Sequence, residues 1–423
     1  MAHLHLWAFL QGIGHYPGGW RDPGATPRAV FDIDYYRRIG QLIERGRFDA
    51  IVFGDQLQGR GANGHTPSRL AIPTLDPMTL LSAIAAVTEH VGLVATVSTT
   101  YNEPDALADR FATLDRLSNG RAGWNIVTTA HPASAWNFGD DAMPEKSTRY
   151  ARAAAFVDAA SALWDGALPA GKTPNPPVGI ANDWFQLETA LATPRTPQVR
   201  PVFVQAGQSP DGRDFAARTA EAIFCPARTI ADGKAFRDDI RARVAKFGRD
   251  PDGVKVMPGL SFVLAATEAA AIAKDEALAN LADPAMCIEY LGESLGYYLG
   301  DHDPDGPIPR DAILAGTEFP PEDIAKPIDA GVASGASLVE FAKTFVRVPR
   351  GHHVFRGTPE QMADMMGDWI AQGACDGFTL QPAYMPGELE LFIDQVVPIL
   401  QARGLLRTEY EGTTLRDRLG KAA

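Results

Sequence analysis

Short apolar runs alternate with longer amphipathic segments along most of this chain of 423 residues, and this alternation constrains its fold more than any other feature. Seven runs have the length and apolar character of buried strands, and a segment with helical periodicity follows each of them. The predicted strands are 4–10, 50–53, 92–98, 123–128, 201–205, 222–225 and 254–264. The predicted helices are 33–46, 78–89, 104–118, 148–164, 211–220, 232–247 and 267–281. Strands and helices that alternate in this way predict parallel β/α units.

An eighth strand is predicted at 376–381. The helix before it is expected to begin at Thr358, with Pro359 in its first turn, and a closing helix is expected over 388–401. Eight alternations, with strands apolar enough to be buried on both faces, favour an α/β fold of the closed (β/α)₈ type, a TIM barrel. The alternative is an open doubly wound sheet, which usually carries a Gly-rich fingerprint after its first strand, and none is present there.

Two segments interrupt the alternation. A Pro-rich segment at about 167–200 is predicted to be a long loop, and a segment at about 283–350 is predicted to be a mixed helical insertion near the last strand. Long segments of this kind often form lids or binding loops, so the insertion at 283–350 is the candidate lid. No stretch resembles a linker between domains, and residues 1–423 are therefore expected to form a single barrel domain.

Charge and cysteine content narrow the class of protein. The net charge of −13 opposes binding to a nucleic-acid backbone or to an anionic membrane surface, so neither partner is expected. Cys225, Cys287 and Cys375 lie far apart, which argues against a disulfide framework and against a cysteine-rich metal site. The sequence has no basic leader and no uninterrupted apolar run of about 18 residues, and these features together predict a cytoplasmic protein.

Polar residues follow several of the predicted strands at the point where each strand ends. In a parallel barrel the carboxyl ends of the strands meet at one face, where barrel enzymes place their chemistry. The candidates at this face are Asp55, Thr96, Ser98, Asn125 and Thr129. A ligand rich in uncharged heteroatoms would give such side chains hydrogen-bond partners, and the alternative is that they cap helices or bond to neighbouring loops.

The segment VQAGQSPDGRD at 204–214 has the layout of an anion site. A strand runs into a Gly/Ser turn and then into a helix, so free backbone N–H groups, the Ser209 hydroxyl and close approach at Gly212 could hold a phosphate. Tyr150 and Arg149 begin a helix from which they could reach the same anion. A plain helix cap at Ser209 and a core position for Tyr150 are the alternatives.

The histidines divide between the two ends of the barrel. His3 and His5 form a His-x-His pair that resembles the start of a metal-dependent amidohydrolase barrel. They lie at the beginning of the first strand, however, which in a barrel is the stability face, so a structural role is favoured. His15 follows the same strand in a Gly-rich loop and is better placed for acid–base chemistry. His352 and His353 are compatible with either a loop or a site.

Five motifs, in order along the chain, resemble the bacterial-luciferase-like superfamily. They are FGDQ at 53–56, ATVSTTYNEP at 95–104, FATLDRLSNGRAGWNIVTT at 111–129, STRYARAAAFVDA at 147–159 and VQAGQSPDGRDFAARTAEAIF at 204–224. Within the superfamily they are similar to the branch of nitrilotriacetate, EDTA and dibenzothiophene-sulfone monooxygenases. The segment at 376–420 strengthens the resemblance, which therefore spans essentially the whole chain.

This resemblance implies a flavin-dependent, two-component monooxygenase built on a barrel. A separate NAD(P)H-dependent FMN reductase would supply reduced FMN, and this chain would use it with O₂ to oxidise a small organic substrate, without a metal. Oxidation beside nitrogen gives N-dealkylation and oxidation beside sulfur gives C–S cleavage. The sequence does not choose between an aminopolycarboxylate and a sulfur compound. Superfamily members are commonly dimers or tetramers, so the resemblance also implies a homo-oligomer.

The resemblance assigns roles to the strand-end residues. Those expected to contact the isoalloxazine and the ribityl chain are Asp55, Asn125 and either Thr96 or Ser98. Those expected near the reactive edge of the flavin, where the related sulfone monooxygenases have histidine and serine, are His15 and Thr129. They are the catalytic candidates.

The FMN phosphate is expected at the anion site. Tyr150 and Ser209, together with the backbone around Gln208 and Gly212, would hold it. Lys146 stands where relatives usually carry histidine, four residues before the tyrosine. A cation at this position still suits a phosphate, although the geometry of the contact would differ.

Three other functions remain open. The first is a metal-dependent TIM-barrel hydrolase built on His3 and His5, and the second is a non-catalytic flavin-binding protein, for which Lys146 is the only hint. The third is a deazaflavin-dependent oxidoreductase of the same superfamily. A polycarboxylate substrate would require cationic side chains at the pocket, and the loops offer Arg21, Arg60, Arg69, Arg347 and Arg350.

Overall fold

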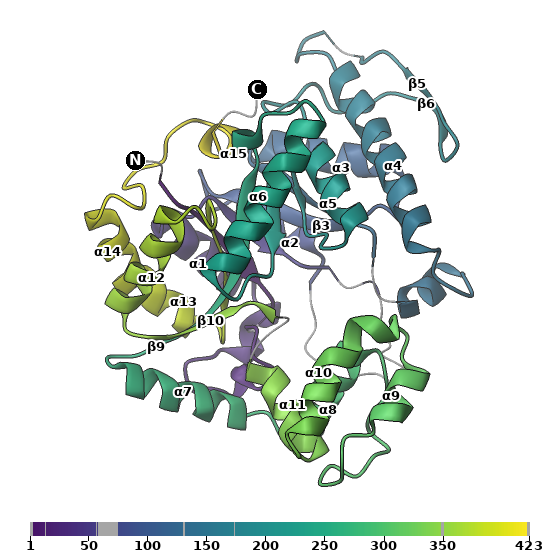
Figure 1. Cartoon of the computed structure of the whole chain (residues 1–423). Coiled ribbons are helices and arrows are strands. Elements are labelled where there is room, and N and C mark those ends of the chain that lie inside the picture. The colour runs from purple at the N-terminus through teal and green to yellow at the C-terminus, as the bar shows by residue number, and fades with distance from the viewer. Residues whose placement is uncertain are drawn as a thin grey trace.

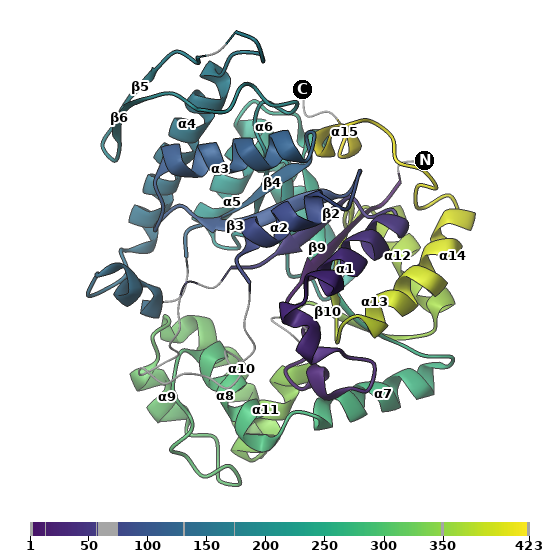
Figure 2. The same cartoon turned by 180° about the vertical axis from the view of Figure 1, so that it is seen from behind.

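Eight parallel strands close into a barrel in the computed structural model, which describes residues 3–12, 14–55, 57, 75–129, 132–172, 174–347 and 351–420 (Figures 1 and 2). The strands are β1 (His5–Leu10), β2 (Ala50–Phe53), β3 (Gly92–Ser98), β4 (Ala122–Val127), β7 (Val202–Gln205), β8 (Ala222–Cys225), β9 (Lys255–Leu264) and β11 (Gly377–Pro382). Each pairs with the next in this order, and β11 returns to pair with β1. The predicted (β/α)₈ barrel is confirmed.

Helices surround the barrel and connect its strands. They are α1 (Ile33–Arg45), α2 (Pro77–Ala85), α3 (Pro104–Leu117), α4 (Lys146–Gly166), α5 (Pro210–Thr219), α6 (Ile230–Lys246), α7 (Glu268–Asn280) and α12 (Pro359–Ala371). Hydroxyl side chains begin several of them, for example Thr229 and Thr358, each of which forms a capping box with the third residue of its helix. The predicted closing helix is divided into α13 (Gly387–Leu391), a π-helical turn (Phe392–Val396) and α14 (Val397–Ala402).

Alternate residues of the strands fill the inside of the barrel, as the two-residue period of a strand requires. Trp7, Val94 and Val204 belong to this inner cluster, which also includes Leu415 and Leu419 from the region of the short helix α15 (Leu415–Arg418). Leu415 reaches the amino end of the barrel so closely that a Cβ on Gly92 would lie 2.6 Å from its Cδ1. Helix α15 therefore closes the amino end of the barrel, opposite the carboxyl ends of the strands, which carry the candidate site.

The segment at 167–200 contains a β-hairpin that the sequence analysis missed. Its strands are β5 (Val178–Ala181) and β6 (Gln186–Thr189), which pair antiparallel. Their residues alternate between half-buried and exposed, so neither strand has the buried face that produces a recognisable apolar pattern. The prediction of a long loop was wrong for these residues.

In the segment predicted as an insertion at 283–350, the described residues 283–347 contain four helices. They are α8 (Pro284–Leu295), α9 (Arg310–Gly316), α10 (Pro321–Ala333) and α11 (Leu338–Arg347). They share a hydrophobic cluster of their own, in which Leu291, Ile328 and Leu338 are fully or almost fully buried. Figures 1 and 2 show these helices as a lobe beside the barrel, with α11 close to α7. We refer to α8–α11 as the helical insertion.

A ninth parallel strand, β10 (His353–Gly357), follows the insertion and was not predicted. It pairs with residues 260–264 of β9, whereas β8 pairs with residues 255–258 of the same strand. Strand β10 thus takes over as the partner of β9 where β8 ends. His353 begins this strand, and its Nδ1 lies 2.8 Å from the Arg228 carbonyl oxygen. Within the described residues, no helix combines the length and apolar character needed to cross a membrane.

Candidate active site

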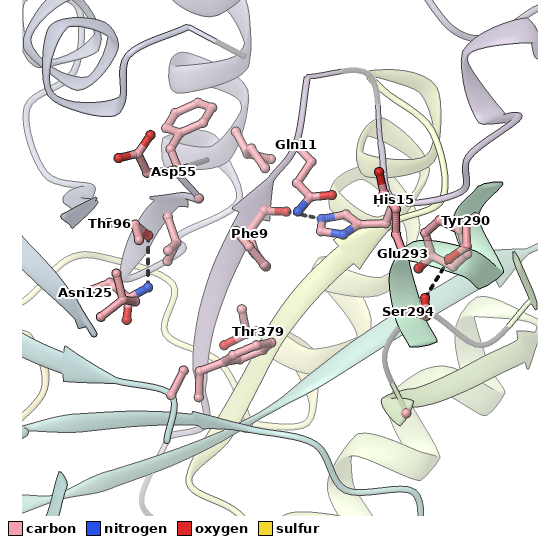
Figure 3. A pocket seen from close by; sticks show the side chains of 18 of the residues that line it. Phe9, Gln11, His15, Asp55, Thr96, Asn125, Tyr290, Glu293, Ser294 and Thr379 are labelled. Carbon is pink, nitrogen blue, oxygen red and sulfur yellow. Dashed lines mark hydrogen bonds between the residues drawn. The ribbon is translucent and has the colours of Figure 1, made fainter. Parts of the chain in front are cut away.

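A cavity of about 1510 Å³ lies at the carboxyl ends of the barrel strands, and the helical insertion forms one of its walls (Figure 3). Seven of the eleven predicted site residues line it: His15, Asp55, Thr96, Ser98, Asn125, Thr129 and Tyr150. The four that do not line it are Lys146, Gln208, Ser209 and Gly212. Lining does not establish the roles of the seven residues, which stay predictions.

Strands β3 and β4 carry a layer of paired polar side chains. Thr96 and Asn125 are register partners, and Asn125 Nδ2 donates a hydrogen bond of 2.9 Å to Thr96 Oγ1. One step further along β3, Ser98 Oγ and Thr129 Oγ1 lie 2.7 Å apart. Val94 of β3 lies in the cluster inside the barrel. Residues two apart on a strand face the same side, so Thr96 and Ser98 also face the barrel interior. Asn125 Oδ1 is buried and has no hydrogen-bond partner among the described residues, so it is available as an acceptor.

Thr129 has a left-handed backbone with a φ of 53°. This conformation is unfavourable for a β-branched residue and costs on the order of 1–3 kcal/mol, which the surrounding structure must offset. The contact with Ser98 holds the Thr129 hydroxyl at the cavity wall. Strain of this kind is concentrated at functional sites, which supports the choice of Thr129 as a site residue.

The loop that carries His15 is pressed against the end of β11. The His15 amide donates to the Pro382 carbonyl at 2.9 Å, and the Tyr16 amide donates to the Ala383 carbonyl at 3.1 Å. Gly14, with a φ of +123°, has no room for a side chain, because a Cβ would lie 2.5 Å from the Ala383 carbonyl oxygen. This packing fixes the loop and the imidazole on it.

The hydrogen bond of one ring nitrogen of His15 shows which nitrogen carries a proton. Nε2 lies 2.8 Å from the Phe9 carbonyl oxygen, which can only accept a hydrogen bond, so Nε2 carries the proton (Figure 3). In the neutral imidazole Nδ1 is then the basic nitrogen. The tautomer is thus set by the backbone of β1.

Tyr150, Ser209 and Gly212 lie close together at the start of α5. Burial raises the pKa of Tyr150 above its usual value, and the nearby side chains of Ser209 and Thr128 oppose this shift in part. A Cβ on Gly212 would lie 2.7 Å from the Tyr150 hydroxyl, so only glycine permits this approach. Ser209 also caps α5, accepting a hydrogen bond of 3.2 Å from the Gly212 amide. The cap is therefore present, and a phosphate contact stays a prediction.

Gln208 and Lys146 lie outside the cavity wall. Gln208 Nε2 is 3.3 Å from the Ala206 carbonyl oxygen and 3.4 Å from that of Phe224, so its side chain braces the turn after β7. Lys146 is exposed at the first residue of α4. Arg149 is the more enclosed cation of this helix, since burial lowers its pKa and its buried Nε has no hydrogen-bond partner among the described residues.

The sequence analysis missed two groups of cavity residues. At the floor, Trp7 of β1 and Thr379 of β11 are register partners, and neither Trp7 Nε1 nor Thr379 Oγ1 has a hydrogen-bond partner in the described chain. In the outer part, the missed charged residues are Arg228, Glu293 and Lys326. Helical spacing along α8 and α10 could have indicated one face of each helix, but not that this face meets the barrel.

The histidine pair on β1 is not part of the cavity lining. His5 Nδ1 lies 3.2 Å from Oδ1 of the buried Asp49, which also receives a hydrogen bond of 2.6 Å from Arg407. In the part of the chain that the structure describes, no three residues of the His, Cys, Asp and Glu types are grouped as metal ligands. His5 is therefore accounted for by an ion-pair network at the opposite end of the barrel.

The arginines considered for a polycarboxylate do not line the cavity where they are described. Arg21 lies 3.2 Å from Asp283, and Arg347 lies 2.7 Å from Asp275. Arg60, Arg69 and Arg350, as well as Gln56 of the FGDQ motif, lie outside the described residues. Arg228 and Lys326 are the described cations at the cavity instead.

Comparison with known proteins places this architecture among oxygenases. The sequence model of a family described as luciferase-like monooxygenase matches residues 11–302. Nitrilotriacetate monooxygenase component A of Aminobacter aminovorans is 40% identical over an alignment of 442 residues, which covers 99% of this chain and 96% of that protein. N-acetyl-S-(2-succino)cysteine monooxygenase of Bacillus subtilis is 39% identical over 430 residues, with the same two coverages. A crystal structure of riboflavin lyase with modified FMN and riboflavin has a TM-score of 0.85 and 28% identity, covering 99% of this chain and 96% of that one.

Proposed function

Because the chain belongs to the luciferase-like monooxygenase family, we propose that it is the oxygenase of a two-component system that uses reduced FMN and O₂ to oxidise a small organic substrate. Family membership makes it a monooxygenase. The flavin, the separate reductase and the position of oxidation are the parts that we propose. The alternative of a metal-dependent hydrolase has no support in the described residues, where His5 pairs with Asp49.

The observation that carries the proposal is the cavity with its unpaired buried polar atoms. Pockets for single small ligands measure roughly 300–1,000 Å³, so a cavity of about 1510 Å³ has room for a cofactor and a substrate together. A buried polar group without a partner costs about 1–3 kcal/mol, and a bound ligand would remove that cost. Trp7 Nε1 and Thr379 Oγ1 can donate, and Asn125 Oδ1 can accept, which suits the mixed donors and acceptors of a flavin ring.

The residues present fit FMN at both ends of the molecule. Thr96, Ser98, Asn125 and Asp55 would contact the ring and the ribityl chain from the ends of β2–β4. We expect the phosphate at the amino end of α5, where the hydroxyls of Tyr150 and Ser209 and the backbone at Gln208 and Gly212 would hold it. Arg149 and Lys146, from the first turn of α4, are the cations that we expect to approach it. The riboflavin lyase structure, which holds a modified FMN, supports this cofactor.

Bound reduced FMN would supply the electron pair and activate O₂. The chain itself orients the reactants, excludes water and moves protons. The contact of His15 Nε2 with the Phe9 carbonyl orients the imidazole, and His15 would act as the acid–base residue beside the flavin. The insertion contributes Tyr290, Phe341 and Phe345 to the cavity wall, and these aromatic side chains would keep water from the reacting atoms.

The position of oxidation and the reductase rest on the relatives. One relative is a nitrilotriacetate monooxygenase and another acts on an N-acetyl-S-(2-succino)cysteine, which supports oxidation of carbon beside nitrogen or sulfur. The description of the first as component A supports a separate NAD(P)H-dependent reductase. We also propose a homo-oligomer, a dimer or tetramer, in the cytoplasm, where the free and buried Cys225, Cys287 and Cys375 would remain reduced.

The test combines binding and turnover. We expect reduced FMN to bind the purified protein under anaerobic conditions, and reduced deazaflavin to bind more weakly. With an unrelated flavin reductase, NADH and O₂, a panel of aminopolycarboxylates, thioethers and sulfones should give a product that contains one atom of ¹⁸O from ¹⁸O₂. Binding of reduced FMN without product across the panel would favour a non-catalytic flavin protein, and absence of binding would contradict the proposal.

A further inference from the structure

Asp275 of α7 is fully buried and receives hydrogen bonds from three separate segments of the chain. Tyr16 Oη donates to Asp275 Oδ1 at 2.5 Å. Arg347 donates to Asp275 Oδ2 from Nε at 3.1 Å and from Nη2 at 2.7 Å, and Arg356 donates to the same oxygen from Nε at 2.7 Å. These residues belong to the loop after β1, the end of α11 and β10. We call the four side chains the Asp275 clasp.

The clasp holds a carboxylate and a neutral phenol. Burial alone would raise the pKa of Asp275, but the hydrogen bonds from Tyr16, Arg356 and Arg347 outweigh it and hold that pKa below its ordinary value. Burial, followed by the nearby Asp275 charge, raises the pKa of Tyr16. Tyr16 is therefore a proton donor to a charged acceptor, which is a strong type of hydrogen bond.

One end of the clasp lies at the proposed acid–base residue. Tyr16 is the neighbour of His15, both residues line the cavity, and Tyr16 is only 2% exposed. The backbone of this short loop is bonded to Pro382 and Ala383, so the loop is held both by the end of β11 and by the Tyr16 hydroxyl on Asp275. The Tyr16 hydroxyl is thus one of the contacts that hold the loop carrying His15.

The other end lies at the insertion. Arg347 is the last residue of α11, and three residues of the same helix, Phe341, Thr344 and Phe345, line the opposite wall of the cavity. Figure 1 shows α11 next to α7, which carries the shared carboxylate. The Tyr16 hydroxyl also lies 3.4 Å from the Arg347 carbonyl oxygen, so the loop and the helix end touch directly as well.

We propose that Asp275 is a positioning residue that couples the insertion wall of the cavity to the loop carrying His15. A substrate that packs against α11 would then also set the imidazole at the reactive edge. An ion pair with a purely local role would stabilise α7 without linking these two segments. The consequence for catalysis rests on the proposed function, whereas the mechanical coupling does not.

The first experiment measures the coupling without flavin or substrate. Hydrogen–deuterium exchange is compared in peptides covering 14–22 and 338–347 for the wild type, Tyr16→Phe and Arg347→Gln. Each variant should accelerate exchange in both peptides, by about tenfold, which corresponds to one lost hydrogen bond to a charged group. Arg310→Gln is the matched control, because the partners of Arg310 among the described residues are Asp311 and Asp329 of the insertion, and it should leave exchange in peptide 14–22 unchanged.

Acceleration confined to the segment that carries the substitution would overturn the proposal. Neither variant removes the buried carboxylate, so both should fold even if Asp275→Asn does not. The second experiment uses turnover. Tyr16→Phe and Arg347→Gln should each lower the product formed per O₂ consumed by about threefold, and the double variant should be no worse than either single one, because both act through Asp275.

Dissociation constants for reduced FMN should stay within twofold in these variants, since no clasp residue is expected to contact the cofactor. Additive losses of product would contradict a shared carboxylate. If exchange shows reciprocal coupling while the wild type has no flavin-dependent turnover, the coupling stands and the proposed function fails. If turnover is present and exchange is not reciprocal, the coupling fails and the proposed function stands.

Discussion

The two walls of the cavity are built by different means. On the barrel side, Thr96, Ser98 and Asn125 are fixed by the register of β3 and β4, and hydrogen bonds pair them within the sheet. On the insertion side, Glu293 and Lys326 stand on helices with a separate hydrophobic cluster, connected to the barrel through contacts such as the Asp275 clasp. The position of the barrel wall is therefore set by the sheet, whereas that of the insertion wall depends on how separate helices pack and on the clasp.

Of the substitutions considered, the removal of the Asp275 carboxylate, which connects the two walls, should have the largest effect on the free energy of unfolding. Replacing Asp275 by asparagine leaves Arg347 and Arg356 without their buried carboxylate, and loss of one partner of a buried ion pair costs about 3–5 kcal/mol. Urea unfolding should show a decrease of this size in the free energy of unfolding. Arg310→Gln, at an exposed pair, should leave the free energy of unfolding almost unchanged. Equal losses in the two variants would mean that the clasp is no stronger than a surface contact.

A substitution in the barrel wall should change the affinity for reduced FMN more than the KM for substrate. Asn125→Leu removes a buried acceptor and the partner of Thr96, so we expect reduced FMN to bind more weakly by about 1–3 kcal/mol. Anaerobic fluorescence titration measures this affinity. The KM for substrate, determined at saturating flavin, should change less than twofold. A change in KM with unaltered flavin affinity would place Asn125 at the substrate instead.

The insertion wall should show the opposite pattern. Lys326→Gln removes a charge from the cavity and should raise the KM of a carboxylate-bearing substrate about tenfold, which corresponds to about 1.4 kcal/mol, with flavin affinity unchanged. Glu293→Gln is the matched control of opposite charge and should lower the KM of the same substrate or leave it unchanged. Parallel effects of both substitutions would indicate a packing role without charge recognition.

Acid should weaken the connection between the walls. The pKa of Asp275 is lowered in the folded state, so its carboxylate contributes stability that is present above the ordinary pKa of 3.8 and is lost as the pH falls through the folded value. As the pH falls below about 3.8, the wild type should therefore lose stability relative to Asp275→Asn, by up to about 1.4 kcal/mol for each pH unit, until the pH reaches the folded pKa of Asp275. Identical acid profiles from urea unfolding would show that Asp275 is not a stabilised carboxylate.

The smallest effect on stability is expected at Thr129. Glycine accepts a φ of 53° without strain, but Thr129→Gly also removes the hydroxyl that contacts Ser98. A gain of about 1 kcal/mol and a loss of about 1 kcal/mol should leave the melting temperature almost unchanged. The product formed per O₂ should nevertheless fall, and Thr129→Ser should preserve it. A melting temperature that falls by many degrees would show that the hydroxyl is mainly structural.

The sequence predicted the barrel wall better than the insertion wall, for a physical reason. Asn125 and Thr96 could be found because strand parity and strand ends determine where their side chains lie. The helical insertion was expected as a segment, but its cavity residues Glu293 and Lys326 depend on how independent helices pack. The Tyr16–Asp275 bond joins residues 259 positions apart and follows no period. Hairpin β5–β6 and strand β10 escaped prediction because few of their residues are fully buried.

The closure of the amino end of the barrel by helix α15 has a consequence for how the protein is made. The last strand of the barrel, β11, ends at Pro382, but Leu415 and Leu419, which come later in the sequence, fill the amino end of the barrel interior. During synthesis the ring of strands can therefore assemble before these leucines have emerged from the ribosome. Before Leu415 and Leu419 have emerged, Trp7 and Val94, which share a cluster with them, would be exposed to water at the amino end of the barrel. A barrel that closed without Leu415 and Leu419 would lack the side chains that fill the amino end of its interior.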